Sequence, residues 1–385
     1  MNPDLNRLQP YPFERIKSLK EGIVPPDDKP LISLSIGEPK HKCPDFITQA
    51  VSDNLVDFQQ YPLTKGGAAL RTIISQWLEQ RFTLGAQTID PDQHVIPVNG
   101  TREALFAFAQ CVVDPTIANA KVLSPNPFYQ IYEGAAIASR AEIIHLNLTK
   151  ENNFKAPIEP EVLKRCDFVI INYPNNPTAA SATLEELKAW AQAALDYDFV
   201  LLNDECYSEI YVGKKDPSLL EASLMIGNTD FKNIIVVNSI SKRSSAPGLR
   251  SGFIAGDAKI LKAYMQYRTY VGAASPLPLQ HASAAAWNDE THVANNREKY
   301  SKNFTIAKEI LGIKVPSSTF YIWLEVEDDI DFTKRLYHDK NLKVLPGSFL
   351  SRGEFKTKHI RIALVENEER TKMALTRIKE LLDGR

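Results

Sequence analysis

Short runs of apolar, β-branched residues alternate with longer amphipathic stretches between residues 95 and 255. The runs have the length of strands, and the stretches have the length of helices. In Thr183–Tyr197, apolar residues recur every three or four positions, and Thr183 and Glu186 can form a capping box. This alternation favours an α/β fold with a mostly parallel sheet covered by helices on both faces. The strands are expected at Val95–Val98, Lys121–Ser124, Glu142–Leu146, Phe168–Asn172, Phe199–Asn203, Ile234–Asn238 and Phe253–Ala255, and further helices at Thr101–Val112 and Phe128–Ala138.

The pattern of apolar residues changes after about residue 275. Helical stretches through Ala285 and Lys308 precede a strand near Phe320–Val326, a helix from Asp331 and a last helix from Glu366. Such a tail is typical of a separate α+β domain. We therefore expect a large domain at residues 46–275 and a small domain at residues 276–385. Residues 1–45 are expected to pack against the small domain.

Size and composition limit the kind of protein. The 385 residues exceed the roughly 100–200 residues of one ordinary domain. The net charge of −2 shows no basic excess, so we expect no nucleic-acid or anionic-membrane partner. There is no signal-peptide pattern and no apolar run of the roughly 20 residues that span a bilayer. The four cysteines lack zinc-ligand spacing. These features predict a cytoplasmic protein with reduced thiols and no metal site.

A lysine among small hydroxyl residues follows the predicted strand Ile234–Asn238. Ligands of open α/β sheets bind outside the carboxyl ends of the strands. A lysine there can form an imine with an aldehyde cofactor if its amine is partly neutral. Taken alone, Lys242 would be an ordinary loop lysine. Ser239 lies three residues before it and Arg250 eight after it, and a hydroxyl with a guanidinium suits a phosphate monoester.

The strand Phe199–Asn203 leads directly into two carboxylates, Asp204 and Glu205. A carboxylate at a strand end can hold the proton of a pyridinium ring and so keep the ring able to accept electrons. Tyr207 lies three residues after Asp204 and can donate to the 3-oxygen of such a cofactor. Glu205 is a rival for the carboxylate role, although alternation along the strand directs it to the opposite side. In isolation, Asp204 would be a helix cap or a loop residue.

Three further segments suit the same kind of site. Asn176 lies between two prolines after the strand Phe168–Asn172, so its amide is held rigidly, although a simple turn also explains the segment. Gly100 permits a tight turn, and the helix amides that begin at Thr101 can bind phosphate oxygens. Arg361 lies in a short apolar strand and needs a carboxylate partner, which is either a substrate or an internal Asp or Glu.

Together these motifs resemble those of the class I and II aminotransferases, which are pyridoxal-phosphate enzymes of fold type I. The motifs are NGTRE, NPFYQIYEG, YPNNPT, DECY, SISKRSSAPGLRSGF and RIAL, and they follow the expected order over nearly the whole chain. The resemblance implies a large domain with a mostly parallel seven-stranded sheet, a smaller α+β domain and the cofactor pyridoxal 5′-phosphate. It also implies amino acids and 2-oxo acids as substrates.

The resemblance assigns roles to the matching residues. Lys242 would bind the cofactor as an imine and then act as general base, Asp204 would pair with the pyridinium nitrogen, and Arg361 would bind the substrate α-carboxylate. Asn176 and Tyr207 would donate to the 3-oxygen, with Asn176 also at the substrate. The phosphate cup would consist of Gly100, Thr101, Arg102, Ser239 and Arg250.

Further assignments depend on the resemblance alone. Tyr129 would stack on the cofactor ring, with Phe128 as the alternative, and Gly37 would contact the substrate near its carboxylate. Members of the family are usually homodimers with shared active sites, and Tyr61 would cross to the phosphate of the partner's cofactor. One departure is Ala179, where many relatives have glycine, and we expect it to alter the turn slightly.

The family mechanism implies ping-pong kinetics. The opening MNPDLNRLQPYPFERIKSL and the segments SLSIGEPKH and SKRSSAPGLRSGF resemble the succinyldiaminopimelate aminotransferases of bacterial lysine biosynthesis, which pair this substrate with glutamate and 2-oxoglutarate. A long dicarboxylic substrate needs a second cationic anchor besides Arg361. The sequence leaves this anchor open among Lys65, Arg102, Arg243, Arg268 and a residue of the partner chain.

Other activities remain open on the same scaffold. An alanine, aspartate or aromatic aminotransferase is the alternative within the family, and a carbon–sulfur β-lyase is the alternative from another reaction class. A non-catalytic sensor is disfavoured, because the chain retains Lys242 and has no appended DNA-binding domain.

Overall fold

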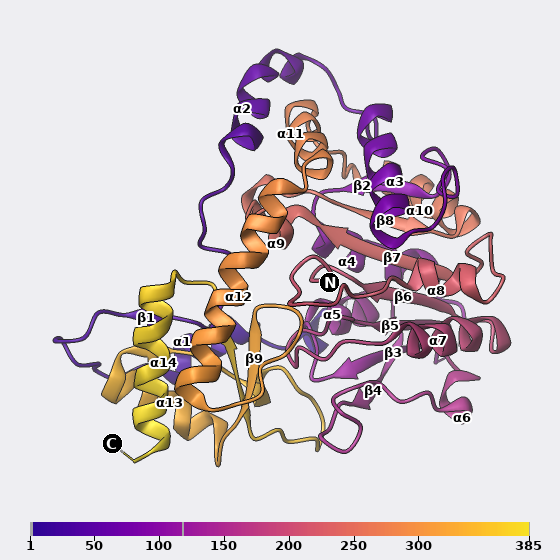
Figure 1. The fold of residues 1–385 in the computed structure, drawn as a ribbon. Helices are drawn as coiled ribbons and strands as arrows, with labels where there is room; N and C mark the ends of the chain where they lie inside the picture. Colours follow the sequence, from indigo (N-terminus) through magenta and orange to yellow (C-terminus); the bar gives the residue numbers. More distant parts are fainter. Residues whose placement is uncertain (1–2, 118, 385) are drawn as a thin grey trace.

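The computed structural model describes residues 3–117 and 119–384. Its larger part contains a seven-stranded sheet with the strand order β2-β8-β7-β6-β5-β3-β4 (Figure 1). Neighbouring strands are parallel, except that β8 runs antiparallel to β2 and β7. The strands are β2 Val95–Val98, β3 Lys121–Asn126, β4 Glu142–Asn147, β5 Phe168–Ile171, β6 Val200–Asp204, β7 Ile234–Ser239 and β8 Gly252–Gly256. The predicted α/β fold is confirmed, and each predicted strand is present within two residues of its expected bounds.

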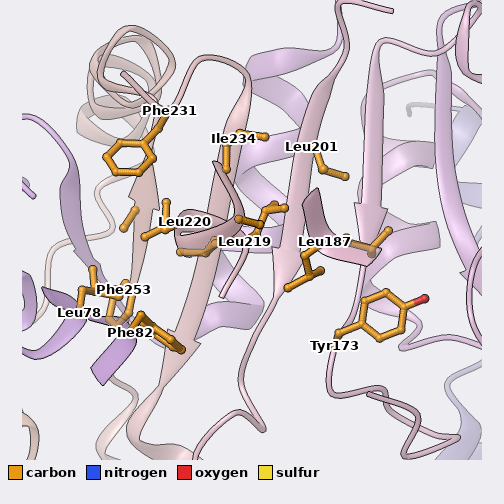
Figure 2. Close-up of a cluster of buried hydrophobic side chains, with 14 of the residues drawn as sticks. Leu78, Phe82, Tyr173, Leu187, Leu201, Leu219, Leu220, Phe231, Ile234 and Phe253 are labelled. Carbon is orange, nitrogen blue, oxygen red and sulfur yellow. The ribbon is translucent and has the colours of Figure 1, made fainter. Parts of the chain in front are cut away.

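Helices cover both faces of this sheet, because its strands carry apolar side chains on each face. Helices α3, α7, α8 and α11 pack on one face, and α4, α5 and α10 pack on the other. In Figure 2, Leu219 and Leu220 of α8 lie close to Leu201 and Ile234 of the sheet. The helices of this part are α2 Asp45–Asp53, η2 Leu55–Gln59, α3 Ala68–Phe82, α4 Thr101–Val112, α5 Ile131–Ala138, α6 Pro160–Leu163, α7 Leu184–Asp196, α8 Leu219–Met225, α9 Ile240–Arg243, η3 Pro247–Leu249, α10 Ala258–Val271 and α11 Leu277–Asn288.

Helix α7 begins at the predicted capping box. The hydroxyl of Thr183 accepts a hydrogen bond from the backbone N–H of Glu186 at 3.3 Å. The carboxylate of Glu186 accepts in turn from the backbone N–H of Thr183 at 2.7 Å. This exchange satisfies two amides that the first helical turn leaves without partners. The helix then buries Leu187 and Trp190 against the sheet.

A smaller α+β unit follows, as the fold class predicts. It holds an antiparallel sheet with the order β11-β12-β9 and a parallel pair formed by β1 and β10. Helices α12, α13 and α14 share one apolar core with these strands. The elements are α1 Pro12–Leu19, β1 Ile32–Ser33, α12 Thr291–Leu311, β9 Tyr321–Glu325, α13 Asp329–Lys340, β10 Leu342–Lys343, β11 Leu345–Pro346, η4 Gly347–Phe349, β12 His359–Ala363 and α14 Glu368–Leu382. The short helix η1 Pro3–Arg7 instead contacts α5 of the larger part.

The domain limits predicted at residues 45 and 275 stay predictions. The packing of the elements near each limit is described below. Helix α11 packs on α2 and α3, and its Ala282, Ala286 and Trp287 belong to the core of the large sheet. The long helix α12 then extends from this region to the small unit (Figure 1). In the N-terminal segment, α1 packs through Ile16 against Leu350, and β1 pairs with β10 of the small unit. None of the described helices is both long and apolar enough to cross a membrane.

Candidate active site

The predicted site residues gather where the strands β2, β5, β6 and β7 end, beside the small unit. A cavity of about 500 Å³ lies there. The predicted residues that line it are Gly37, Thr101, Arg102, Tyr129, Asn176, Asp204, Tyr207, Ser239, Lys242, Arg250 and Arg361. The structure thus brings together residues that are far apart in the sequence, while the role of each stays a prediction.

Lys242 lies on the short helix α9, directly after β7. Its ammonium group is partly buried and donates to the carbonyl of Gly37. The Nζ atom lies 5.9 Å from the centre of the Tyr207 ring and 5.7 Å from that of Phe320. Burial lowers the pKa of Lys242 to about 8, and the positive charge of Arg361 adds to this effect. A substantial fraction of the amine is therefore neutral near pH 8, as imine formation requires.

Asp204 ends β6 and turns its carboxylate into the cavity. Its Oδ2 accepts a hydrogen bond from the Tyr132 hydroxyl at 2.8 Å, and its Oδ1 accepts from the backbone N–H of Cys206 at 3.2 Å. Burial raises the pKa of Asp204, and the hydrogen bonds from Cys206 and Tyr132 act in the opposite direction. A buried carboxylate held in this way suits a cationic ring N–H.

The rival carboxylate, Glu205, points away from the cavity, as the alternation predicts. Glu205 accepts hydrogen bonds from the Ser218 hydroxyl and from the backbone N–H of Leu219, at 2.9 and 2.8 Å. Burial raises the pKa of Glu205 to about 8. Its partners hold the start of α8, which gives Glu205 a structural role.

The first turn of α4 and the guanidinium of Arg250 form a cradle for an anion. No side chain caps α4, so the amides of Thr101 and Arg102 at its start can bind a phosphate oxygen. Gly100 has a φ of +78°, and a Cβ there would collide with the guanidinium of Arg250. Arg250 donates to the carbonyl of Pro247 and so keeps other N–H groups for a ligand. Ser239 and Thr101 line the same part of the cavity.

Arg361 on β12 has the geometry of a carboxylate receptor. Its Nη1 donates to Asn176 Oδ1 and its Nη2 to the carbonyl of Ser35, both at 2.7 Å. Its Nε is buried and has no hydrogen-bond partner, and no Asp or Glu of the described chain forms an ion pair with it. The internal-carboxylate alternative is therefore disfavoured, because a permanent charge is left for a ligand to neutralise.

Tyr129 and Phe128 differ clearly in position. Tyr129 lines the cavity, whereas Phe128 is fully buried and stacks on His145 with ring centroids 5.1 Å apart. The Tyr129 hydroxyl accepts a hydrogen bond from Arg102 Nε at 2.6 Å. Tyr129 is thus the better candidate for stacking on the cofactor.

Two other predicted features lie outside the cavity. Tyr61 does not line it and is fully exposed in the single chain, so its proposed contact needs a second copy and stays a prediction. Ala179 has a φ of +60°, in the left-handed region that favours glycine. Alanine here adopts a backbone conformation that glycine adopts more easily, and the expected slight change of the turn stays a prediction.

Several cavity residues were not identified from the sequence. They are Tyr11, Glu38, Ser241 and Tyr321, together with Tyr132, which contacts Asp204 from behind. Tyr132 lies three residues after Tyr129, and this closeness along the chain was the available signal. Nothing in the local sequence indicates Tyr11 or Tyr321, because each reaches the cavity from an element far along the chain.

These residues together fit pyridoxal phosphate, since they offer a neutralisable lysine for its aldehyde, a carboxylate for its ring nitrogen and an anion cradle for its phosphate. Comparison with known proteins agrees. Residues 29–378 match the family model "Aminotransferase class I and II". An LL-diaminopimelate aminotransferase of Aquifex aeolicus is 31% identical over 392 residues, which cover 98% of each chain.

Solved structures give the same result. An aminotransferase from Neisseria meningitidis has a TM-score of 0.94 and 40% identity, and the match covers 99% of this chain and 100% of that one. The aminotransferase AspB from Helicobacter pylori has a TM-score of 0.94 and 39% identity, and the match covers 98% and 99% of the two chains. This chain therefore belongs to the class I and II aminotransferases, a family that depends on pyridoxal phosphate.

Proposed function

We propose that this aminotransferase transfers an amino group between N-succinyl-LL-2,6-diaminopimelate and 2-oxoglutarate. The observation that carries the proposal is a further guanidinium, that of Arg102, in the cavity that also holds Arg361 and the proposed phosphate ligand Arg250. Both 2-oxoglutarate and the succinylated substrate carry a carboxylate far from the reacting carbon. Two separate cations therefore suit two separate carboxylates of one substrate.

The other cations considered from the sequence are already engaged elsewhere. Lys65 forms an ion pair with Asp92 at 2.7 Å, and Arg268 is buried and forms an ion pair with Glu103 at 3.2 Å. Neither of them lines the cavity.

Arg243 is likewise fully buried, and it pairs with Glu290 away from the cavity. Among the described side chains, the Tyr129 hydroxyl alone accepts a hydrogen bond from Arg102, and the guanidinium lies 5.7 Å from the centre of the Tyr11 ring. We infer that the backbone of Arg102 serves the phosphate cradle and that its side chain binds the distal carboxylate.

In the proposed reaction, pyridoxal phosphate supplies an aldehyde that receives the amino group and a ring that accepts electrons. Arg361 binds the α-carboxylate of the substrate and so orients the α-carbon. Lys242 Nζ removes the α-proton as general base, and its lowered pKa suits this task near neutral pH. Asp204 holds the proton of the ring nitrogen, and Asn176 and Tyr207 donate to the 3-oxygen. The amino group would be carried on the cofactor from the first half-reaction to the second, so the kinetics are ping-pong.

A second candidate substrate is LL-diaminopimelate itself. The relative from Aquifex aeolicus is named for it, and Glu38 lines the cavity of this chain, where its carboxylate can pair with a distal ammonium group. The two candidates differ in the charge of the distal end, since succinylation removes the ammonium and adds a carboxylate.

The test measures kcat/KM for a set of amino donors with 2-oxoglutarate as acceptor. We expect succinyldiaminopimelate to exceed LL-diaminopimelate, alanine, aspartate and aromatic amino acids. A higher value for any other donor contradicts the proposed substrate. Release of pyruvate from cystathionine, without amino transfer, would instead identify a β-lyase.

The Arg102→Met variant tests the distal anchor in the same assay. Loss of a charge-assisted hydrogen bond should lower kcat/KM for 2-oxoglutarate about 10- to 100-fold. Pyruvate serves as the matched control, since it lacks a distal carboxylate, and we expect its value to change less than about threefold. Equal losses for both acceptors would show that Arg102 acts on the cofactor instead.

A further inference from the structure

Tyr321 contacts several of the proposed site residues, although no role has been assigned to it. It is the first residue of β9 in the small unit, it is 2% exposed, and it lines the cavity. Its hydroxyl lies 2.7 Å from the hydroxyl of Tyr207. The centre of its ring lies 4.4 Å from the guanidinium carbon of Arg361. One side chain thus touches the proposed ligands of both the 3-oxygen and the α-carboxylate.

The backbone of Gly37 leaves room for the Tyr321 hydroxyl. A Cβ at this position would collide with the Tyr321 Oη atom, so a residue other than glycine would displace the hydroxyl. The carbonyl of Gly37 also accepts the hydrogen bond from Lys242. The hydroxyl of Tyr321 therefore occupies a defined place beside the reactive lysine.

The two tyrosine hydroxyls form a closed pair, and counting protons gives the direction of their hydrogen bond. Among the described residues, the Tyr207 hydroxyl forms a hydrogen bond only with the Tyr321 hydroxyl, and the Tyr321 hydroxyl only with that of Tyr207. Each hydroxyl carries one proton, so one proton is used within the pair and one remains for a third group. If Tyr207 gives its proton to the 3-oxygen, the bond within the pair must come from Tyr321. This step rests on the proposed function of Tyr207.

We propose that Tyr321 is a positioning residue, which donates to Tyr207 and thereby orients and strengthens the hydrogen bond from Tyr207 to the 3-oxygen. A hydroxyl that accepts a hydrogen bond becomes a better donor, because the chain of bonds polarises it. With pyridoxal phosphate bound to Lys242, a better donor at the 3-oxygen would compete with the neighbouring cofactor proton for that oxygen. The cofactor then loses this proton at a lower pH.

The Tyr321→Phe variant removes the hydroxyl and keeps the ring below Arg361. We expect the pKa of the Lys242-bound cofactor, followed by its absorbance during a pH titration, to rise by about half to one unit. We expect kcat to fall about three- to tenfold, and KM for the amino donor to change less than about twofold, since the ring still supports Arg361.

A double variant tests whether Tyr321 acts through Tyr207. Tyr207→Phe alone should raise the same pKa, and Tyr207→Phe combined with Tyr321→Phe should raise it no further, because the donor that Tyr321 supports is already absent. An additive shift in the double variant would overturn the proposed route.

Tyr300→Phe is the matched control. Tyr300 belongs to the same buried aromatic cluster, with its ring centroid 5.2 Å from that of Phe320, but it does not line the cavity. We expect its absorbance titration to match that of the wild type, and circular dichroism to show that each variant folds. A similar shift in Tyr300→Phe would attribute the effect to loosened packing and overturn the proposal.

The remaining outcomes are distinct. An unchanged titration in Tyr321→Phe, or a rise in KM without a shift in pKa, overturns the role of Tyr321 and leaves the proposed function intact. A wild-type protein whose absorbance with pyridoxal phosphate does not depend on pH refutes the cofactor roles of Lys242 and Tyr207, and the role of Tyr321 with them.

Discussion

At the scale of single residues, the ammonium group of Lys242 lies beside two aromatic rings and donates to a backbone carbonyl rather than to a carboxylate. Burial holds its pKa at about 8, against an ordinary value of 10.5. Between these two values the unfolded chain binds more protons than the folded chain, so the free energy of unfolding rises with pH in this window. Below pH 8, Lys242 is protonated in both states, and the free energy of unfolding is lowered by the full cost of holding its charge in the folded protein.

The Lys242→Met variant should therefore be more stable than the wild type when both lack the cofactor. We expect a gain of about 3 kcal/mol in the free energy of unfolding at pH 7, measured by urea denaturation. The gain should shrink as the pH rises from 8 towards 10.5. Lys164→Met, at an exposed lysine, is the control and should change stability by less than about 0.5 kcal/mol. A gain that does not depend on pH would contradict the assigned cause.

Residues with a local motif could be predicted from the sequence, and residues without one could not. Lys242, Asp204 and Arg361 follow or lie in apolar runs, and the structure places all three in one cavity. The contact between Tyr132 and Asp204 joins residues 72 positions apart, and that between Tyr321 and Tyr207 joins residues 114 positions apart. Such pairs depend on how elements far apart in the chain pack together, which no local pattern of one sequence contains.

At the scale of elements, the capping box of α7 offers a direct test of a sequence prediction. Replacing Thr183 by alanine removes the side-chain acceptor for the Glu186 amide, and we expect the protein to lose about 1 kcal/mol of stability. Thermal unfolding of the two proteins measures this loss. The Thr183→Ser variant keeps the hydroxyl and should stay close to the wild type. Equal losses in both variants would show that the threonine methyl group, rather than the cap, matters.

The strands could be predicted more closely than the packing of the helices. Apart from the edge strand β4, the strands of the large sheet are mostly buried apolar runs, and burial on both faces leaves a continuous signal in the sequence. The amphipathic pattern of Leu277–Asn288 predicts a helix but does not indicate which sheet the helix covers. In the structure its Trp287 packs with Trp77 and Phe253 of the larger part, at ring-centroid distances of 4.6 and 5.1 Å.

At the scale of the whole molecule, one exposed apolar segment supports the proposed homodimer. Leu55, Val56, Phe58, Tyr61 and Leu63 are all more than half exposed in the single chain. Exposed apolar groups that cluster in this way are uncommon on monomers and mark interfaces. We infer that a second copy covers this segment and that Tyr61 reaches the phosphate of the partner's cofactor.

Mixing two defective variants tests the shared site. Tyr61→Ala should weaken cofactor binding about tenfold or more through loss of a hydrogen bond to a charged group, and Lys242→Ala should be inactive. A mixed dimer has one site with both native residues, so mixing after dissociation should restore activity above that of either variant alone. Tyr270→Ala, at an exposed tyrosine elsewhere, is the control partner. Activity that is only the average of the two variants would contradict a shared site.

The walls of the cavity have separate origins in the chain. The large sheet supplies the groups proposed to hold the cofactor, whereas Tyr11, Gly37 and Arg361 come from the N-terminal segment and the last strand. Mutations near Tyr11, whose ring lies beside Arg102, can therefore alter which amino acid is accepted while Lys242, Asp204 and Arg361 are preserved. Substrate specificity can therefore change, in evolution or by directed mutagenesis, through variants that remain active.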